Sequence, residues 1–312
     1  MEVGLGLPGY RLETGELIPL HELAEQAVRA EELGYASAWV MDHIWVEGPS
    51  GRRISAHEPM MTLAYLAART TRIQLGVLVL CNSFRHPGQL AREAAALADA
   101  APGRVVLGIG AGWHEPEYRA FGFPYDHRVS RLEETLEVLR PLLDGERVDL
   151  AGRHLTLSGA QVITTQPSPP IWVAGRGPRM LALAARHGDG TNVGWLGTDL
   201  TPFLDFSERM RAAVPTRPGF VTSVGLLVLP VADEAERAAV LERAAPHAGR
   251  FWDPARADQM AVIGGPERLA EVLRAYERAG AQHAILNLAI APCAEMDRSY
   301  IERAAPALAL LD

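Results

Sequence analysis

The feature that most restricts the fold of this chain is a regular alternation of short apolar runs with helical segments. The apolar runs, which we interpret as strands, cover residues 3–8, 37–41, 73–80, 105–109, 171–174, 190–194, 221–229 and 283–288. Strands that alternate with helices in this way pair in parallel within one sheet. Eight such units in 312 residues are typical of a closed barrel. We therefore predict an α/β fold in which residues 1–312 form a single (β/α)8 TIM-barrel domain.

One segment, residues 147–163, does not follow this alternation. It consists of short extended pieces interrupted by Gly152 and Gly159, and it comes after a helix that we expect over residues 128–143. We predict a small hairpin-like insertion here rather than a second domain.

The composition narrows the class of protein. Hydrophobic residues make up 48% of the chain and charged residues 22%, as in ordinary globular proteins. The formal net charge of −8 argues against a surface for nucleic acid or for an anionic membrane. No apolar run has membrane-spanning length and no signal segment is apparent, so we expect a cytoplasmic protein.

The sequence contains no lysine; all of its 30 Lys and Arg residues are arginines. This excludes Schiff-base chemistry and a lysine base. It also leaves arginine side chains and backbone N–H groups as the means of binding an anion.

Asp42 and His43 stand directly where the apolar run 37–41 ends. Either side chain is costly to bury without a compensating partner. In an α/β barrel the carboxyl end of each strand opens onto the active site. His43 can transfer a proton near neutral pH, and Asp42 could orient its ring. The alternative is a strand end that is simply capped by two solvated polar residues.

Glycines are dense at the ends of two other predicted strands. Gly108, Gly110 and Gly112 permit close approach of the backbone to a ligand, although a plain turn that needs positive φ is the alternative. Residues 175–179 (Gly-Arg-Gly-Pro-Arg) precede a predicted helix, whose N–H groups and dipole favour an anion. We predict phosphate binding at 175–179. The full dinucleotide fingerprint is missing, so we do not infer NAD.

The sequence does not favour a metal enzyme. The two cysteines, Cys81 and Cys293, form neither a metal-binding cluster nor a disulfide framework. A metal-dependent barrel hydrolase needs a ligand cluster such as a His-x-His pair at the strand ends, and none is present. We predict no metal site.

Four segments occur in a characteristic order: residues 39–43 (Trp-Val-Met-Asp-His), 71–76 together with 83–87, 108–118, and 171–175. With these residues the chain resembles the bacterial luciferase-like family, in particular its branch that uses the deazaflavin coenzyme F420. The resemblance covers almost the whole length. It implies an oxidoreductase that transfers a hydride between F420 and a small organic substrate.

The resemblance also implies roles for individual residues. In the F420 branch the position that matches His43 lies beside the reacting carbon and assists proton transfer, and the position that matches Asp42 contacts the ring system. A cis peptide bond between Leu78 and Val79 is expected to support one face of the ring. Cys81 is expected to pack against the coenzyme, because no partner that would activate a nucleophile is evident.

Positions that match the coenzyme's tail and phosphate site are Ala111, Gly112 and residues 174–178. The full set of residues that we expect at the coenzyme is Asp42, His43, Leu78, Val79, Cys81, Gly110, Ala111, Gly112, Trp113, Ala174, Gly175, Arg176, Gly177 and Pro178.

Two other functions are compatible with the same segments. The first is an FMN-dependent luciferase-like monooxygenase, although flavin-dependent members tend to carry a second histidine instead of the Asp42–His43 pair. The second is a non-catalytic protein that binds a flavin or deazaflavin, since its fold and binding residues would look the same. The retained Asp42–His43 pair favours an enzyme.

The substrate is expected to be apolar. In the sugar-phosphate dehydrogenases of the F420 branch, a catalytic glutamate occupies the position of Trp113 and lysines surround the substrate phosphate. Trp113, with Trp45 and Trp195, would instead line an apolar mouth. We predict that the substrate is a small, neutral carbonyl, alcohol or activated double bond. If the alignment is shifted by a residue or two, Glu115 or Glu117 would take the place of the catalytic glutamate. We also expect a homodimer.

Overall fold

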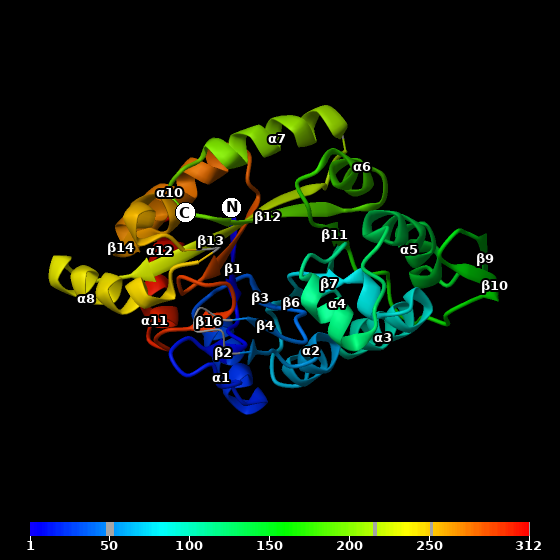
Figure 1. Cartoon of the computed structure of the whole chain (residues 1–312), viewed down its shortest axis with the longest axis horizontal. Coiled ribbons are helices and arrows are strands. Elements are labelled where there is room, and N and C mark those ends of the chain that lie inside the picture. Colours follow the sequence, from blue (N-terminus) through cyan, green and yellow to red (C-terminus); the bar gives the residue numbers. More distant parts are fainter. Residues whose placement is uncertain (48–52, 215–216, 250–251, 312) are drawn as a thin grey trace.

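The computed structural model describes residues 1–47, 53–214, 217–249 and 252–311. In this part of the chain, parallel strands close into a barrel with helices around it (Figure 1). Each strand pairs with its neighbours in the order of the chain, and β11 pairs with β8 as well as with β12, which closes the ring. The barrel strands are β1 (Glu2–Gly6), β3 (Ser37–Val40), β6 (Gln74–Val77) continued by β7 (Leu80–Cys81), β8 (Val105–Gly110), β11 (Ile171–Val173), β12 (Gly190–Leu196), β13 (Val221–Pro230) and β15 (His283–Asn287). The predicted (β/α)8 barrel is confirmed.

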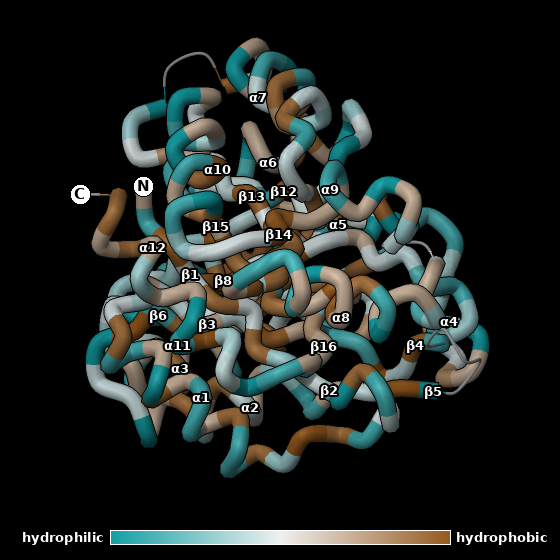
Figure 2. The backbone as a smooth tube through the Cα atoms, turned by 90° about the vertical axis from the view of Figure 1, so that its left-hand side faces the viewer, coloured by the Kyte–Doolittle hydropathy of each residue, from teal (hydrophilic) through white to brown (hydrophobic). Residues whose placement is uncertain are grey.

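The helices form the outer layer because each buries one apolar stripe against the strands. In α10, for example, Leu269, Val272, Leu273 and Tyr276 recur at helical spacing and are all buried. The helices are α1 (Leu20–Glu32), α2 (Pro59–Ala67), α3 (Pro87–Ala100), α4 (Glu115–Phe121), α5 (Arg128–Leu143), α6 (Pro178–His187), α7 (Thr201–Ala213), α8 (Glu234–Ala244), α9 (Ala257–Met260), α10 (Pro266–Arg278), α11 (Tyr300–Ala304) and α12 (Pro306–Ala309). Apolar segments run through the middle of the molecule, around β8, β13 and β14 (Val262–Gly264), which pairs with β13 (Figure 2).

Two tryptophans fill the interior of the barrel. Trp39 of β3 and Trp172 of β11 stack with their ring centroids 5.0 Å apart. Glycines on other strands make room for them: a Cβ on Gly76 of β6 would lie 2.4 Å from the Trp39 ring, and a Cβ on Gly190 of β12 would lie 2.8 Å from the Trp172 ring. The interior of the barrel around these two rings is therefore a packed core, as the fold requires.

The third barrel strand is interrupted between β6 and β7. The peptide bond between Leu78 and Val79 is cis, as predicted, and a second non-proline cis bond that was not predicted joins Gly194 to Trp195. The side chain of Val79 packs against the neighbouring strand β8, where a Cβ on Gly108 or on Gly110 would come within 3.0 Å of it. These two glycines thus accommodate the interrupted strand itself.

Short hairpins extend from the barrel. Strands β9 (Val148–Ala151) and β10 (Thr156–Ala160) pair antiparallel and project beyond α5, so the predicted insertion is confirmed (Figure 1). The Glu134 carboxylate of α5 holds the turn by accepting three backbone N–H groups, from residues 153–155. A second hairpin, β4 (Val46–Glu47) with β5 (Arg53–Ile54), lies between β3 and α2; residues 48–52 lie outside the described part.

Candidate functional site

A cavity of about 920 Å³ lies at the carboxyl ends of the barrel strands. Val46, Glu47 and Ile54 of the β4–β5 hairpin contribute to its wall. The residues predicted to bind a coenzyme line this cavity with two exceptions, Gly177 and Pro178, which begin α6 just beyond it. The predicted residues that do line it are Asp42, His43, Leu78, Val79, Cys81, Gly110, Ala111, Gly112, Trp113, Ala174, Gly175 and Arg176.

His43 is held by Glu117, a residue of α4. The Nδ1 atom of His43 lies 3.0 Å from Oε2 of Glu117, and the other carboxylate oxygen accepts the backbone N–H groups of Ile44 and Trp45. The Glu117 side chain is 2% exposed and that of His43 is 22% exposed. The histidine therefore presents its other ring edge toward the cavity while its inner nitrogen is fixed. Glu117 was mentioned in the sequence analysis only as a substitute acid, and its contact with His43 was missed.

Asp42 has different partners. Its carboxylate forms an ion pair with Arg85 and accepts the backbone N–H of Cys81 at 2.8 Å. The prediction that Asp42 orients His43 is therefore wrong. Consecutive residues of an extended chain point to opposite sides, so the two neighbouring side chains diverge. Asp42 still lines the cavity, where it links the end of β3 to the end of β7.

Aromatic residues form one wall of the cavity. Trp113 is 40% exposed and its ring lies edge-on to His43, with centroids 5.5 Å apart. Trp195 also lines the cavity, as predicted, and so does Trp252, which sequence reasoning missed. The expectation for Trp45 is wrong: this side chain is buried against His114 outside the cavity lining. The expected apolar mouth is present, but only part of its composition was predicted.

Cys81 is a packed thiol rather than an activated one. Its Sγ lies 3.0 Å from the Tyr118 hydroxyl, which donates a hydrogen bond to the Ala111 carbonyl at 2.9 Å. Burial raises the pKa of Cys81 to about 12. A thiol is a poor nucleophile when protonated, which agrees with a packing role. Gly112 has φ +73°, and a Cβ there would lie 1.8 Å from the Tyr118 hydroxyl, so glycine is required for this contact.

Two arginines provide positive charge at the cavity. Arg176 donates to the Gly194 carbonyl at 2.6 Å, and Arg128, at the first turn of α5, stacks over the Tyr125 ring at 3.8 Å. Both line the cavity, and neither forms an ion pair within the described residues. Arg179, the second arginine of the predicted anion site, points away and pairs with Glu133 of α5.

Arg128 was missed because its sequence neighbours suggested only a helix start. The α5 helix begins at Arg128 and α6 begins at Pro178, so the two cations lie near two helix amino termini. Such ends carry partial positive charge and unpaired N–H groups. The arrangement favours a phosphate or carboxylate on this side of the cavity.

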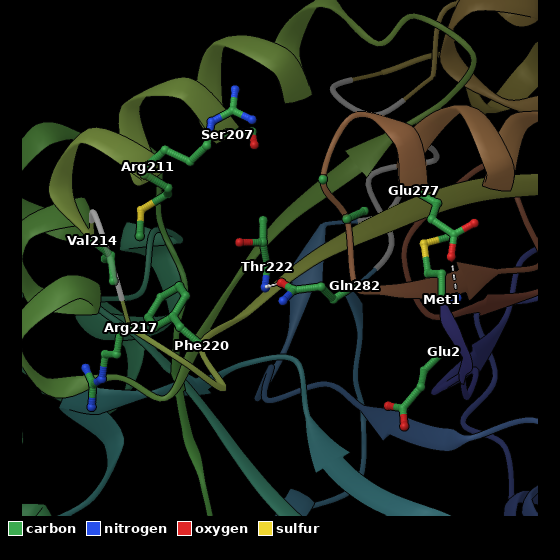
Figure 3. Close-up of a pocket in the computed structure, with 13 residues that line it drawn as sticks. Met1, Glu2, Ser207, Arg211, Val214, Arg217, Phe220, Thr222, Glu277 and Gln282 are labelled. Carbon is green, nitrogen blue, oxygen red and sulfur yellow. Dashed lines mark hydrogen bonds and ion pairs between the residues drawn. The ribbon is translucent and has the colours of Figure 1, made fainter.

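A second cavity, of about 720 Å³, lies at the opposite end of the barrel, near the starts of β13 and β15 (Figure 3). Its polar groups are largely occupied by protein contacts. Glu277 pairs with the amino group of Met1 at 2.6 Å, and the Gln282 side chain accepts the backbone N–H of Thr222 at 2.7 Å. The described residues that line this second cavity include no histidine held by a carboxylate. The first cavity, which has the His43–Glu117 pair, is therefore the candidate active site.

Within the described ranges, no group of three or more His, Cys, Asp and Glu side chains is arranged to hold a metal ion. No described helix combines the length and the apolar character that crossing a membrane requires.

Comparison with known proteins assigns the family. The sequence profile described as luciferase-like monooxygenase matches residues 1–283. The chain belongs to this luciferase-like family, in agreement with the resemblance found in the sequence.

The curated relatives are named as F420-dependent dehydrogenases. An F420-dependent glucose-6-phosphate dehydrogenase of Kineococcus radiotolerans is 37% identical over 191 residues, which are 58% of this chain and 54% of the relative. An F420-dependent hydroxymycolic acid dehydrogenase of Mycobacterium tuberculosis is 34% identical over 195 residues, 60% of this chain and 51% of the relative. The chain thus matches about half the length of these relatives.

Solved structures show the same fold over the full chain. An F420-dependent secondary alcohol dehydrogenase in complex with an F420–acetone adduct superposes with a TM-score of 0.74 at 21% identity, covering 100% of this chain and 99% of that one. An EDTA monooxygenase of Chelativorans sp. BNC1 superposes with a TM-score of 0.80 at 17% identity, covering 99% and 94%. At these identities the likeness concerns the fold.

Proposed function

We propose that this protein is an F420-dependent oxidoreductase that transfers a hydride between the deazaflavin and a small organic substrate, with His43 assisting proton transfer. The observation that carries the proposal is the single cavity at the carboxyl ends of the strands. It brings together a histidine held by a buried carboxylate, the interrupted strand at Leu78–Val79, and the arginines Arg128 and Arg176. Proton transfer, a flat binding wall and anion recognition are the three capacities that such a reaction needs.

The residues of the cavity fit the expected coenzyme. Leu78, Val79 and Cys81 offer an apolar wall to a ring system, and Asp42 offers a carboxylate beside it. Ala111, Gly112 and residues 174–176 lead from there toward the cations, where the tail and its phosphate would lie, with Gly177 and Pro178 at the start of α6 just beyond. When bound, the coenzyme supplies the hydride acceptor or donor. The names of the curated relatives support the same coenzyme.

The proposed substrate is a small, neutral and largely apolar alcohol, carbonyl or activated double bond. Trp113 and Trp195 supply apolar surface with few donors, and the buried Trp252 also lines the cavity. Several relatives are named for glucose 6-phosphate, but this chain has no lysine to pair with a sugar phosphate. The two cavity arginines are already assigned to the coenzyme's anionic part. Efficient oxidation of glucose 6-phosphate with F420 would therefore contradict this substrate class.

The experiment that tests the coenzyme is a titration of purified protein with F420, reduced F420 and FMN, followed by a substrate screen with the tightest ligand. We expect micromolar or tighter binding of F420 and weaker binding of FMN. The alternative function is an FMN-dependent luciferase-like monooxygenase, which tight FMN binding without measurable F420 affinity would establish. Binding of F420 with no turnover across the screen would instead favour a non-catalytic deazaflavin-binding protein.

We also propose a homodimer. Helix α2 buries one face against the barrel, yet its outer face carries Met61 (69% exposed), Tyr65 (36% exposed), Ala64 and Ala68. A helix that is apolar on both faces is normally covered on both. Light scattering after size exclusion should give twice the chain mass of 33.8 kDa. A monomer at high micromolar concentration would contradict the proposal, and Met61→Glu should dissociate the dimer if α2 lies in its interface.

A further inference from the structure

The contact between His43 and Glu117 defines which nitrogen of the imidazole carries its proton. One oxygen of Glu117, Oε1, already accepts two backbone N–H groups, from Ile44 at 2.7 Å and from Trp45 at 3.1 Å. An ionised carboxylate can only accept hydrogen bonds, so at the 3.0 Å contact the Nδ1–H of His43 is the donor and Oε2 is the acceptor.

The other ring nitrogen is left for the cavity. In a neutral imidazole with its proton on Nδ1, Nε2 carries a lone pair. His43 lines the cavity, and Nε2 has no hydrogen-bond partner among the residues that the structure describes. The nitrogen available to a bound molecule is therefore a proton acceptor.

We infer that Glu117 is a positioning residue that fixes this tautomer of His43, so that the site presents a proton acceptor to a substrate hydroxyl group. The inference rests on the proposed function and adds a residue that acts through His43. With an alcohol as substrate, the O–H proton passes to Nε2, and the adjacent C–H bond breaks with its electron pair as the carbonyl forms. The oxidised deazaflavin, when bound, would supply the acceptor for that hydride. The resulting imidazolium lies beside the Glu117 carboxylate, which stabilises its charge.

Glu117→Gln separates a tautomer role from a purely structural one. The amide is nearly isosteric, and its single oxygen is needed by the backbone N–H groups of Ile44 and Trp45. The amide NH2 then occupies the place of Oε2 and donates to Nδ1 of His43. The histidine proton is thereby moved to Nε2, so the cavity-facing nitrogen becomes a donor while the local fold is preserved.

The test combines kinetics with a direct reading of the tautomer. For Glu117→Gln we expect kcat for alcohol oxidation to fall by roughly 10²- to 10⁴-fold, as for a wrong histidine tautomer in other enzymes, with KM and coenzyme affinity changed by less than about threefold. The matched control is Glu115→Gln on the same helix, whose carboxylate faces Arg119 rather than the cavity and should keep the wild-type kcat.

The tautomer is read from imidazole nitrogen-15 NMR spectra of coenzyme-free protein, with the His43 signals assigned by their loss in His43→Gln. We expect a protonated Nδ1 in the wild type and a protonated Nε2 in Glu117→Gln. A protonated Nε2 in the wild type would overturn the inference, even if Glu117→Gln failed to fold. Unchanged kcat in Glu117→Gln, or lost kcat with the proton still on Nδ1, would overturn it too.

The two proposals can fail separately. If F420 binds but Glu117→Gln keeps the wild-type kcat, the role of Glu117 is wrong while the coenzyme assignment stands. If F420 does not bind at all, the proposed function fails, and the nitrogen spectra still decide whether Glu117 sets the tautomer.

Discussion

Two histidines in this barrel, His43 and His283, have opposite surroundings. His283 begins β15 and is 1% exposed. Among the described residues its ring has one hydrogen-bond partner, the Ser37 hydroxyl at 2.8 Å, and the Trp39 and Trp172 rings lie edge-on to it. Burial lowers the pKa of His283 to about 3, so its ring is neutral in the folded protein at any ordinary pH. His43 follows β3, faces the cavity, and is held by a buried carboxylate.

The difference shows what a histidine needs in order to act. Both rings are fixed by one hydrogen bond, but only His43 has a partner that can balance a positive charge and a nitrogen open to a ligand. A neutral hydroxyl cannot stabilise an imidazolium in an apolar core, and the aromatic rings around His283 exclude water. The closed end of the barrel, around His283 and the two stacked tryptophans, therefore supports the fold, and the proposed chemistry belongs to the open end, at the cavity beside His43.

The largest effect should come from removing the imidazole at the open end. His43→Ala should slow turnover by roughly 10²- to 10⁴-fold, because a general acid–base group contributes about that much. Coenzyme affinity should change far less. The matched control is His86→Asn, at the exposed start of α3, where asparagine can keep the helix cap. Steady-state kinetics and coenzyme titration measure both quantities, and wild-type turnover in His43→Ala would reduce His43 to a packing residue.

Much of the fold could be predicted from the sequence. Apolar runs of strand length and the helical spacing between them reflect local rules, so the barrel and the insertion at 147–163 were anticipated. The resemblance supplied most of the expected coenzyme residues, and all of that set except Gly177 and Pro178 line the cavity. The cis bond at Leu78–Val79 was predicted by resemblance alone. The second cis bond, Gly194–Trp195, carries no comparable signal in the chain.

The open end was predicted less well, because its contacts join distant segments. Glu117 meets His43 across 74 residues of sequence, and nothing local distinguishes it from Glu115 two residues earlier. The error about Asp42 had a local cause: neighbours on an extended chain point apart, so Asp42 turned to Arg85. Gly108 and Gly110 were expected to admit a ligand; both accommodate the interrupted strand, and of the two Gly110 also lines the cavity.

The next largest effect should appear at the closed end, and it should concern stability. Gly76→Ala would place a methyl group 2.4 Å from the Trp39 ring, and such overpacking typically costs about 1–3 kcal/mol of unfolding free energy. Gly6→Ala is the control on another barrel strand, where the new Cβ would meet its nearest atom at 3.4 Å. Urea unfolding should rank the two variants in this order. Equal stabilities would show that the two tryptophans are loosely packed.

Charge at the cavity should affect ligand binding and leave stability unchanged. Arg128→Ala and Arg176→Ala should each weaken coenzyme binding by about tenfold, because each removes one charged contact to an anionic group. Arg179→Ala is the control, since Arg179 pairs with Glu133 outside the cavity. Fluorescence titration of the coenzyme, repeated at high salt, provides the measurement. Equal losses in all three variants would show that the effect is a general one of net charge.

The smallest effect, per unit of pH, should come from His283. An unfolded chain protonates this histidine near its ordinary pKa of about 6.5, whereas burial keeps the folded pKa at about 3. Between these values the unfolded state binds one more proton, so unfolding free energy should rise with pH across this window. The slope of unfolding free energy against pH approaches about 1.4 kcal/mol per pH unit inside this window and disappears above the window. In His283→Gln, the unfolding free energy measured with urea at successive pH values should rise less steeply with pH, because the contribution of His283 to the slope is missing. Parallel curves for the two proteins would mean that His283 takes up a proton in the folded state, and the contrast with His43 would be lost.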